Sequence, residues 1–198
     1  MKKLFYLILF FIGSLNAQQF ARPISDLDNT GVWTTQPLWS NLDDNVSTIT
    51  SGNDYVKNDG SAESTEPFTV DLGALSDPYS SSGHIIEYYA AKFTSGGAIV
   101  DFTVELRQGY VNESSQGTLI ASAVQADIQQ IFNIGNMTTY ELTSSEADAI
   151  TDYSDLQFRI FCEKNGGGAN REIRLFACQI IVPPAGTPPA RNRIIIIN

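Results

Sequence analysis

Histidine and cysteine are scarce in this chain, which has one His and two Cys among 198 residues. Structural and catalytic zinc sites are built from several His and Cys ligands, so this composition argues against one. The lone His84 follows the three serines Ser80 to Ser82. No nucleophile-elbow sequence surrounds it, so we interpret the segment as a polar turn before a strand and not as a Ser–His catalytic pair.

Positive charge is also scarce, with 12 Lys and Arg against 22 Asp and Glu and a formal net charge of −10 at pH 7. Phosphate-rich partners repel such a protein, which disfavours nucleic-acid binding and docking on an anionic membrane. An acidic surface is also the ordinary means of keeping an exported protein soluble. Paired carboxylates serve glycoside hydrolysis only at a separation that the fold sets. The sequence assigns no catalytic residue, and we expect no enzyme activity.

Long hydrophobic runs are absent except near the N-terminus, where Lys2 and Lys3 precede the apolar segment Leu4 to Ile12. This run is about half of the roughly 20 residues that span a bilayer. A basic start, a short apolar run and the ending Leu15-x-Ala17 are typical of a signal peptide. We therefore expect residues 1–17 to be cleaved off. The mature protein should be secreted, on the cell surface or in a virion, with no stable membrane span.

Short segments of alternating apolar and polar residues dominate the rest of the chain. In Ala98 to Arg107, every second residue from Ala98 to Leu106 is apolar, which predicts a strand with one core face and one solvated face. Similar runs occur at residues 68–72, 85–93, 118–123, 138–142, 156–162 and 173–182. This pattern predicts an all-β fold over residues 18–182, an antiparallel β-sandwich that is either jelly-roll or immunoglobulin-like.

One short helix interrupts the strand pattern. Thr143 and Glu146 stand three residues apart as a capping box, and Ala147, Ala149 and Ile150 follow. The next strand is expected at residue 156. The helix should therefore be one or two connecting turns that cover one end of the sandwich.

The two cysteines, Cys162 and Cys178, lie on segments 156–163 and 171–182, which the turn at residues 165–168 joins. In a simple hairpin centred on that turn, the cysteines are offset by about six residues, or roughly 20 Å along a strand. Bridged Cα atoms lie within about 7 Å of each other. We therefore expect two buried free thiols.

Asp26 and Asp28 begin a sequence that resembles a calcium loop, with oxygen ligands at alternate positions followed by Gly31. Pro37 stands where an EF-hand supplies its bidentate Glu, which excludes an EF-hand. An irregular calcium site at Asp26 and Asp28 remains the one cofactor hypothesis. The alternative is turn chemistry, in which Asp side chains bond the nearby backbone.

Aromatic side chains are the candidate ligand-binding residues. Trp33, Trp39 and Tyr88 head the set, which also includes Tyr55, Tyr79 and Tyr89. Exposed rings of this kind can stack on a sugar ring, and the alternative for most of them is packing in the core.

Three stretches resemble a known family: Arg22 to Asp26 with Gly31 to Thr34, Ser80 to His84, and Leu142 to Leu156. They look like a recurrent, largely uncharacterised family of phage-encoded β-sandwich proteins, over about residues 20–160. The resemblance implies a β-sandwich in a virion or host-facing appendage and implies no catalytic residue. The signal peptide departs from a usual phage tail or capsid protein. A membrane-containing virus, or a cellular secreted protein built on the same module, would reconcile the two.

The C-terminal region combines a linker and a hydrophobic tail. Residues 183–190 are rich in proline and predict a stiff, extended linker. Residues 191–198 contain Arg191, Arg193 and the four isoleucines Ile194, Ile195, Ile196 and Ile197. An exposed run of this kind promotes aggregation, so we expect the sheet edge of a neighbouring subunit to cover it. The alternatives are that the tail folds back as the domain's own last strand or is removed by processing.

Two function classes follow from these patterns. The first is an exported structural or adhesive protein, a virion or surface component that assembles with itself or a neighbouring subunit through its tail. The second is a secreted carbohydrate-binding module that holds a surface glycan on exposed aromatic rings, with or without calcium.

Overall fold

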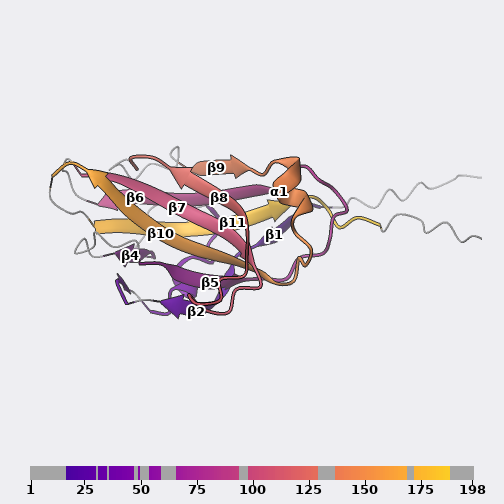
Figure 1. The fold of residues 1–198 in the computed structure, drawn as a ribbon, viewed down its shortest axis with the longest axis horizontal. Coiled ribbons are helices and arrows are strands. Elements are labelled where there is room, and N and C mark those ends of the chain that lie inside the picture. Colours follow the sequence, from indigo (N-terminus) through magenta and orange to yellow (C-terminus); the bar gives the residue numbers. More distant parts are fainter. Residues whose placement is uncertain are drawn as a thin grey trace, which may run out of the picture.

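A computed structural model of the chain describes residues 17–29, 31–34, 36–46, 49, 54–58, 66–93, 98–128, 137–168 and 172–187. Two antiparallel sheets pack face to face, with the strands along the long axis and one short helix at an end (Figure 1). This confirms the predicted all-β sandwich. The elements are β1 Gln19–Ala21, β2 Pro23–Asn29, β3 Trp33–Thr34, η1 Trp39–Asn41, β4 Val56–Asn58, β5 Phe68–Leu72, β6 Ile85–Phe93, β7 Ile99–Gln108, β8 Thr118–Gln125, β9 Thr138–Glu141, α1 Ser144–Asp148, β10 Leu156–Gly166 and β11 Glu172–Val182.

The strand order selects the jelly-roll alternative over the immunoglobulin-like one. Sheet A has the order β3-β4-β11-β6-β9, with β1 also paired to β11, and sheet B has the order β2-β5-β10-β7-β8. From β4 onward the strands pair as nested partners: β4 with β11, β5 with β10, β6 with β9 and β7 with β8. This nesting is the jelly-roll pattern, in which one long antiparallel hairpin is rolled up so that β4 to β11 place four strands in each sheet.

The predicted hairpin between the last two long strands is wrong. Strand β10 pairs with β5 and β7 in sheet B, whereas β11 pairs with β4, β6 and β1 in sheet A. The turn at residues 165–168 therefore carries the chain from one sheet to the other. Both strands have apolar residues on the face toward the core, and a sandwich buries those faces more completely than an isolated hairpin does.

Cys162 on β10 and Cys178 on β11 are free and buried, which confirms the expectation of two unbridged thiols. The reason differs from the predicted one, because the strands that carry them lie in opposite sheets. Burial raises the pKa of Cys162 to about 12 and raises the pKa of Cys178 as well. Neither side chain is thus a reactive thiolate near pH 7.

The core lies between the inner faces of the two sheets. Alternate residues of β7 contribute Val100, Phe102, Val104 and Leu106 to it, as the sequence pattern predicts. A second apolar cluster covers the outer face of sheet A and consists of Val46, Ile49, Tyr89, Ala91, Phe176 and Ala177. Sheet A is therefore buried on both faces over part of its length, which explains the nearly continuous burial of β11.

The outer face of β7 is not simply solvated, contrary to the sequence expectation. Arg107 is 9% exposed and Thr103 is 8% exposed. Part of this cover is the turn between β7 and β8, in which Asn112 and Ser115 form a β-bridge. There Arg107 donates a hydrogen bond to the backbone oxygen of Gln116 at 3.1 Å.

Glu113, in the same turn, anchors the turn to sheet B. The guanidinium of Arg159 on β10 donates to Glu113 at 2.9–3.3 Å and to Glu105 at 3.2 Å. Arg159 and Glu105 side chains are 13% and 12% exposed. Burial acts to raise the pKa of Glu113, but hydrogen bonds from Arg159 and Tyr110 outweigh it and lower that pKa.

Replacing Glu113 by Ala should lower the free energy of unfolding by about 1–3 kcal/mol, because it removes the main partner of the largely buried Arg159 guanidinium. Urea denaturation at pH 7 measures this change. Since the folded-state pKa is depressed, the contribution is present above the unfolded-state pKa of about 4.3 and is lost as pH falls through the folded value. The difference between the two proteins should therefore shrink below about pH 4. The exposed Glu163 on β10 is the control, and an equal loss in Glu163→Ala would contradict the assignment.

The short helix α1 forms as predicted. The Thr143 hydroxyl accepts a hydrogen bond from the Glu146 backbone N–H at 3.3 Å, and the Glu146 carboxylate accepts one from the Thr143 backbone N–H at 2.7 Å. This capping box satisfies two backbone donors that the first turn would leave unpaired. The buried Ala147 turns inward. The helix lies at one end of the sandwich, as expected (Figure 1).

Candidate functional site

Trp33 lies in the core, where it is 1% exposed. Its ring packs edge-on against Phe68 at 4.9 Å and Phe102 at 6.4 Å between centroids. Its Nε1–H donates to the backbone oxygen of Glu66 at 3.0 Å. A ring enclosed in this way cannot stack on a ligand, so the structure contradicts the role predicted for Trp33 and favours the core-packing alternative.

Tyr88 and Trp39 do not form a ligand platform either. Tyr88 is fully buried and packs against Phe102 with 5.5 Å between ring centroids. This contradicts its predicted role for the same reason as for Trp33. Trp39 is partly buried against the core. The structure thus does not bring the three predicted aromatic residues together on one surface.

Asp26 and Asp28 lie on strand β2 and not in a calcium-type loop. The Asp26 carboxylate accepts backbone N–H bonds from Leu38 at 2.9 Å and Trp39 at 2.8 Å, so it fixes the start of η1. The Asp28 carboxylate accepts a hydrogen bond from the Tyr110 hydroxyl at 3.2 Å. No group of three or more metal-ligating side chains occurs among the residues that the structure describes. These contacts favour the alternative in which the carboxylates bond the nearby chain.

The remaining predicted sites lie mostly outside the described residues. The isoleucines Ile194 to Ile197, proposed for assembly, fall there, as does nearly all of the expected signal peptide. Both therefore stay predictions. Within the described ranges, no helix is both long and apolar enough to cross a membrane.

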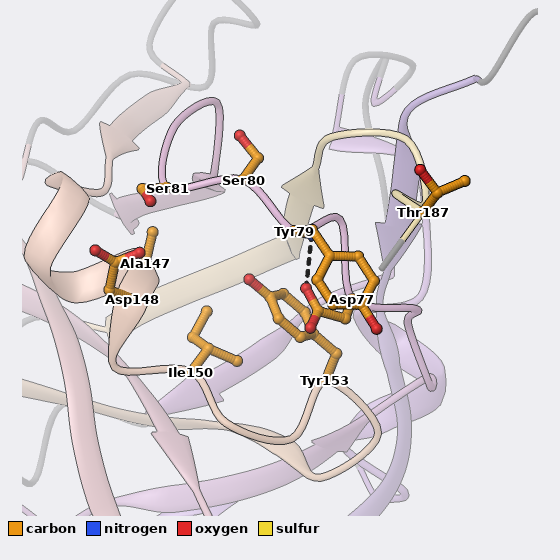
Figure 2. A pocket seen from close by; sticks show the side chains of 9 residues that line it. All are labelled: Asp77, Tyr79, Ser80, Ser81, Ala147, Asp148, Ile150, Tyr153 and Thr187. Carbon is orange, nitrogen blue, oxygen red and sulfur yellow. Dashed lines mark hydrogen bonds between the residues drawn. The ribbon is translucent and has the colours of Figure 1, made fainter. Parts of the chain in front are cut away.

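A pocket of about 440 Å³ opens at the end of the sandwich beside α1 (Figure 2). Three parts of the chain form its wall. The loop between β5 and β6 contributes residues 77 and 79–81, α1 and the loop after it contribute residues 147, 148, 150 and 153, and the segment after β11 contributes residue 187. The lining residues are Asp77, Tyr79, Ser80, Ser81, Ala147, Asp148, Ile150, Tyr153 and Thr187.

Tyr79 presents an aromatic ring at the pocket and is 51% exposed. Its backbone has φ +50°, a left-handed conformation that is uncommon for a residue with a side chain. The Asp77 carboxylate holds it by accepting the Tyr79 backbone N–H at 2.7 Å. The surrounding structure thus imposes this orientation, and strain of this kind concentrates at binding sites.

The segment after β11 supports the Tyr79 loop from behind. Gly186 donates its backbone N–H to the Asp77 backbone oxygen at 3.2 Å. A Cβ at residue 186 would lie 2.2 Å from the Pro78 oxygen and 3.0 Å from the Tyr79 ring, so only glycine permits this contact. The described part of the predicted linker, residues 183–187, is therefore packed against the domain.

Tyr153 forms the base of the pocket. It is 7% exposed, and its hydroxyl lies 2.7 Å from Nε2 of the fully buried His84. Burial, followed by the charges of Asp77 and Asp148, raises the pKa of Tyr153 to about 12. Burial also lowers the pKa of His84, so this imidazole is neutral at pH 7. The His84–Tyr153 pair is thus a buried structural support beneath the pocket wall.

The wall of the pocket combines an apolar ring, hydroxyls and carboxylates. Figure 2 shows Tyr79 and Tyr153 on one side and Asp148 with Ser81 on the other, with Ile150 between them. Such a surface offers a stacking face together with hydrogen-bond acceptors and donors. This combination can bind a small polar molecule that has both an apolar face and hydroxyl groups.

Sequence reasoning found one residue of this pocket, Tyr79, as a member of the wider aromatic set. It did not find Asp77, Asp148 and Tyr153, because they lie in loops or at a helix end, where polar sequence is typical of solvent-exposed chain. The one signal in the sequence for a site here was Tyr79. This large aromatic residue lies between Pro78 and three serines, in a turn outside the predicted strands, where core packing does not require a ring.

No protein-family model matches the chain. No curated protein matches it either. Among solved structures, it is similar to the CBM22-1 xylan-binding domain of a Paenibacillus barcinonensis protein, with a TM-score of 0.41 and 15% identity over 87% of this chain and 99% of that one. A cleaved adhesin domain of Lys-gingipain from Porphyromonas gingivalis gives 0.40 and 15% over 82% and 90%. A CBM61 module in complex with β-1,4-galactotriose gives 0.35 and 11% over 82% and 88%. At these values, none of them assigns a ligand to this chain.

Proposed function

We propose that this protein is an exported, non-enzymatic binding protein that recognises a carbohydrate in the pocket beside α1. One observation carries the proposal: the exposed ring of Tyr79 lies next to the carboxylate of Asp77, and Ser80 and Ser81 line the same pocket. Sugar rings have an apolar C–H face and a rim of hydroxyls, so they match a ring flanked by polar groups. The pocket, and not the weak structural similarities, supports this function.

The geometry also agrees with binding in preference to catalysis. The carboxylates of Asp77 and Asp148 both lie in exposed positions. General acid catalysis of glycoside hydrolysis needs a carboxyl group whose pKa is raised by its surroundings. Such surroundings are apolar and shield the carboxyl group from water, whereas both carboxylates of the pocket are exposed to solvent.

Replacing Tyr79 by Ala should lower the affinity for the bound oligosaccharide at least tenfold, or about 1.4 kcal/mol, because it removes the stacking face. Binding is measured by calorimetric titration with β-1,4-linked oligomers of glucose, xylose, galactose, N-acetylglucosamine and glucosamine. Because the Tyr79 side chain is half exposed, thermal unfolding should change little.

The matched control is Phe93→Ala. Phe93 is 48% exposed and ends strand β6, which begins next to His84 at the pocket end. Its replacement should leave oligosaccharide affinity unchanged. Equal losses in the two variants, or full affinity in Tyr79→Ala, would place the binding surface elsewhere.

A further inference from the structure

Among the residues that the structure describes, the charged ones that line the pocket are all of one sign. Asp77 and Asp148 are acidic, and the other seven lining residues carry no charge near pH 7. His84 lies behind Tyr153 and is fully buried, so it supplies no positive charge to the opening. The pocket therefore repels phosphate, sulfate and uronic-acid groups and attracts cations.

Neither carboxylate is neutralised within the part of the chain that the structure describes. The ion pairs found there involve Lys57, Lys92, Arg107, Arg159 and Arg174, and none of these contacts Asp77 or Asp148. One oxygen of Asp77 accepts the Tyr79 backbone N–H, and that contact leaves its charge in place.

The position of Asp148 also disfavours a purely structural role. It is the last residue of α1, and no basic residue occupies the last turn of that helix. A negative charge at a helix C-terminus is unfavourable, because the terminal carbonyl groups are already partly negative. The carboxylate thus brings a small cost to the helix and contributes charge to the pocket wall.

The exposed Tyr79 ring adds a second feature that favours a cation in the pocket. The exposed face of Tyr79 attracts a cation placed within about 6 Å of its centre. The two carboxylates attract the same cationic group, and the one beside it can accept its N–H hydrogen bonds. A neutral sugar uses the ring and the hydroxyls of this pocket but leaves both charges uncompensated.

We propose that the pocket selects sugars that carry a protonated amine, of the glucosamine type, over their N-acetylated and neutral counterparts. This inference rests on the carbohydrate-binding function proposed above. It adds a ligand class to that function. Acetylation of the amine removes the positive charge and leaves the sugar ring and linkage unchanged, so the two kinds of sugar differ in the feature that the pocket would recognise.

The test compares full-length protein binding to β-1,4-linked oligomers of glucosamine and of N-acetylglucosamine at the same chain length and pH. Glucosamine oligomers should bind about tenfold more tightly, and Asp148→Asn should remove most of this preference. Asp77→Asn should do the same, since the amide oxygen keeps the hydrogen bond to Tyr79. The control is Glu163→Gln, which changes the net charge equally at an exposed residue that does not line the pocket. It should keep the full preference.

The outcomes separate the two proposals. Equal binding of both oligomers, with Tyr79→Ala weakening each, would overturn the amine selectivity and leave carbohydrate binding in place. A preference for glucosamine that Glu163→Gln abolishes as strongly as Asp148→Asn would also overturn it, because the attraction would then come from overall charge. Absence of binding to every oligomer of the panel would overturn carbohydrate binding itself and the selectivity with it.

Discussion

Replacing Trp33 by Ala should lower the free energy of unfolding by about 3–5 kcal/mol, the usual cost of removing a large buried aromatic side chain. Trp33 is 1% exposed and contacts Phe68 and Phe102 in the centre of the sandwich. Truncation leaves a cavity between the sheets and an unpaired backbone oxygen on Glu66. Urea denaturation followed by tryptophan fluorescence of Trp39 and by circular dichroism measures the loss.

This expected loss changes how a binding experiment must be designed. A Trp33→Ala protein that fails to retain sugar would report on folding and not on ligand contacts. Trp39→Ala is the comparison, since Trp39 is only partly buried against the core and should cost less. A stability of Trp33→Ala within 1 kcal/mol of the original protein would contradict its central place in the core.

Gly117→Ala should lower the free energy of unfolding by about 3 kcal/mol, from left-handed strain together with overpacking. Gly117 has φ +64°, and a Cβ there would lie 2.2 Å from the Gln108 oxygen and 2.6 Å from the Gly109 carbonyl carbon. These are backbone atoms at the base of the turn that carries Glu113, so they cannot rotate away. Thermal and urea unfolding measure the effect.

Gly73→Ala is the matched control for this change. Its backbone does not require a left-handed φ, and the nearest atom to an added Cβ is Ile24 Cγ2 at 3.8 Å, an ordinary contact. We expect stability within about 0.5 kcal/mol of the original protein. If both glycine variants lose the same stability, the close approach at Gly117 is not the cause.

Local patterns in the sequence predicted the elements well. The run around Ala98 to Arg107 became β7, and the runs at 68–72 and 85–93 became β5 and β6 with the same bounds. Strand alternation and a capping box depend on neighbouring residues, so they can be read from the chain alone. The short strands β1 to β4 were not predicted, because two to seven residues with Pro, Asp and Asn among them show little alternation.

Strand pairing and the candidate site depended on contacts between distant residues. The turn after β10 looks like a hairpin turn in the sequence, yet each flanking strand gains more by burying its apolar face between two sheets. The pocket has the same origin, since its wall brings together residues 77, 148, 153 and 187. No local pattern marks a residue whose role depends on a neighbour that far along the chain.

The sequence by itself determined the all-β class, the main strands, the capped helix and the acidic surface, because these follow from residue period and composition. Only the tertiary structure decided that Trp33 and Tyr88 are core residues, that Asp26 holds the η1 backbone and that Tyr79 faces a pocket. The physical reason is that burial is a property of the packed sheets: the same aromatic side chain stabilises a core or binds a ligand according to what the fold places over it.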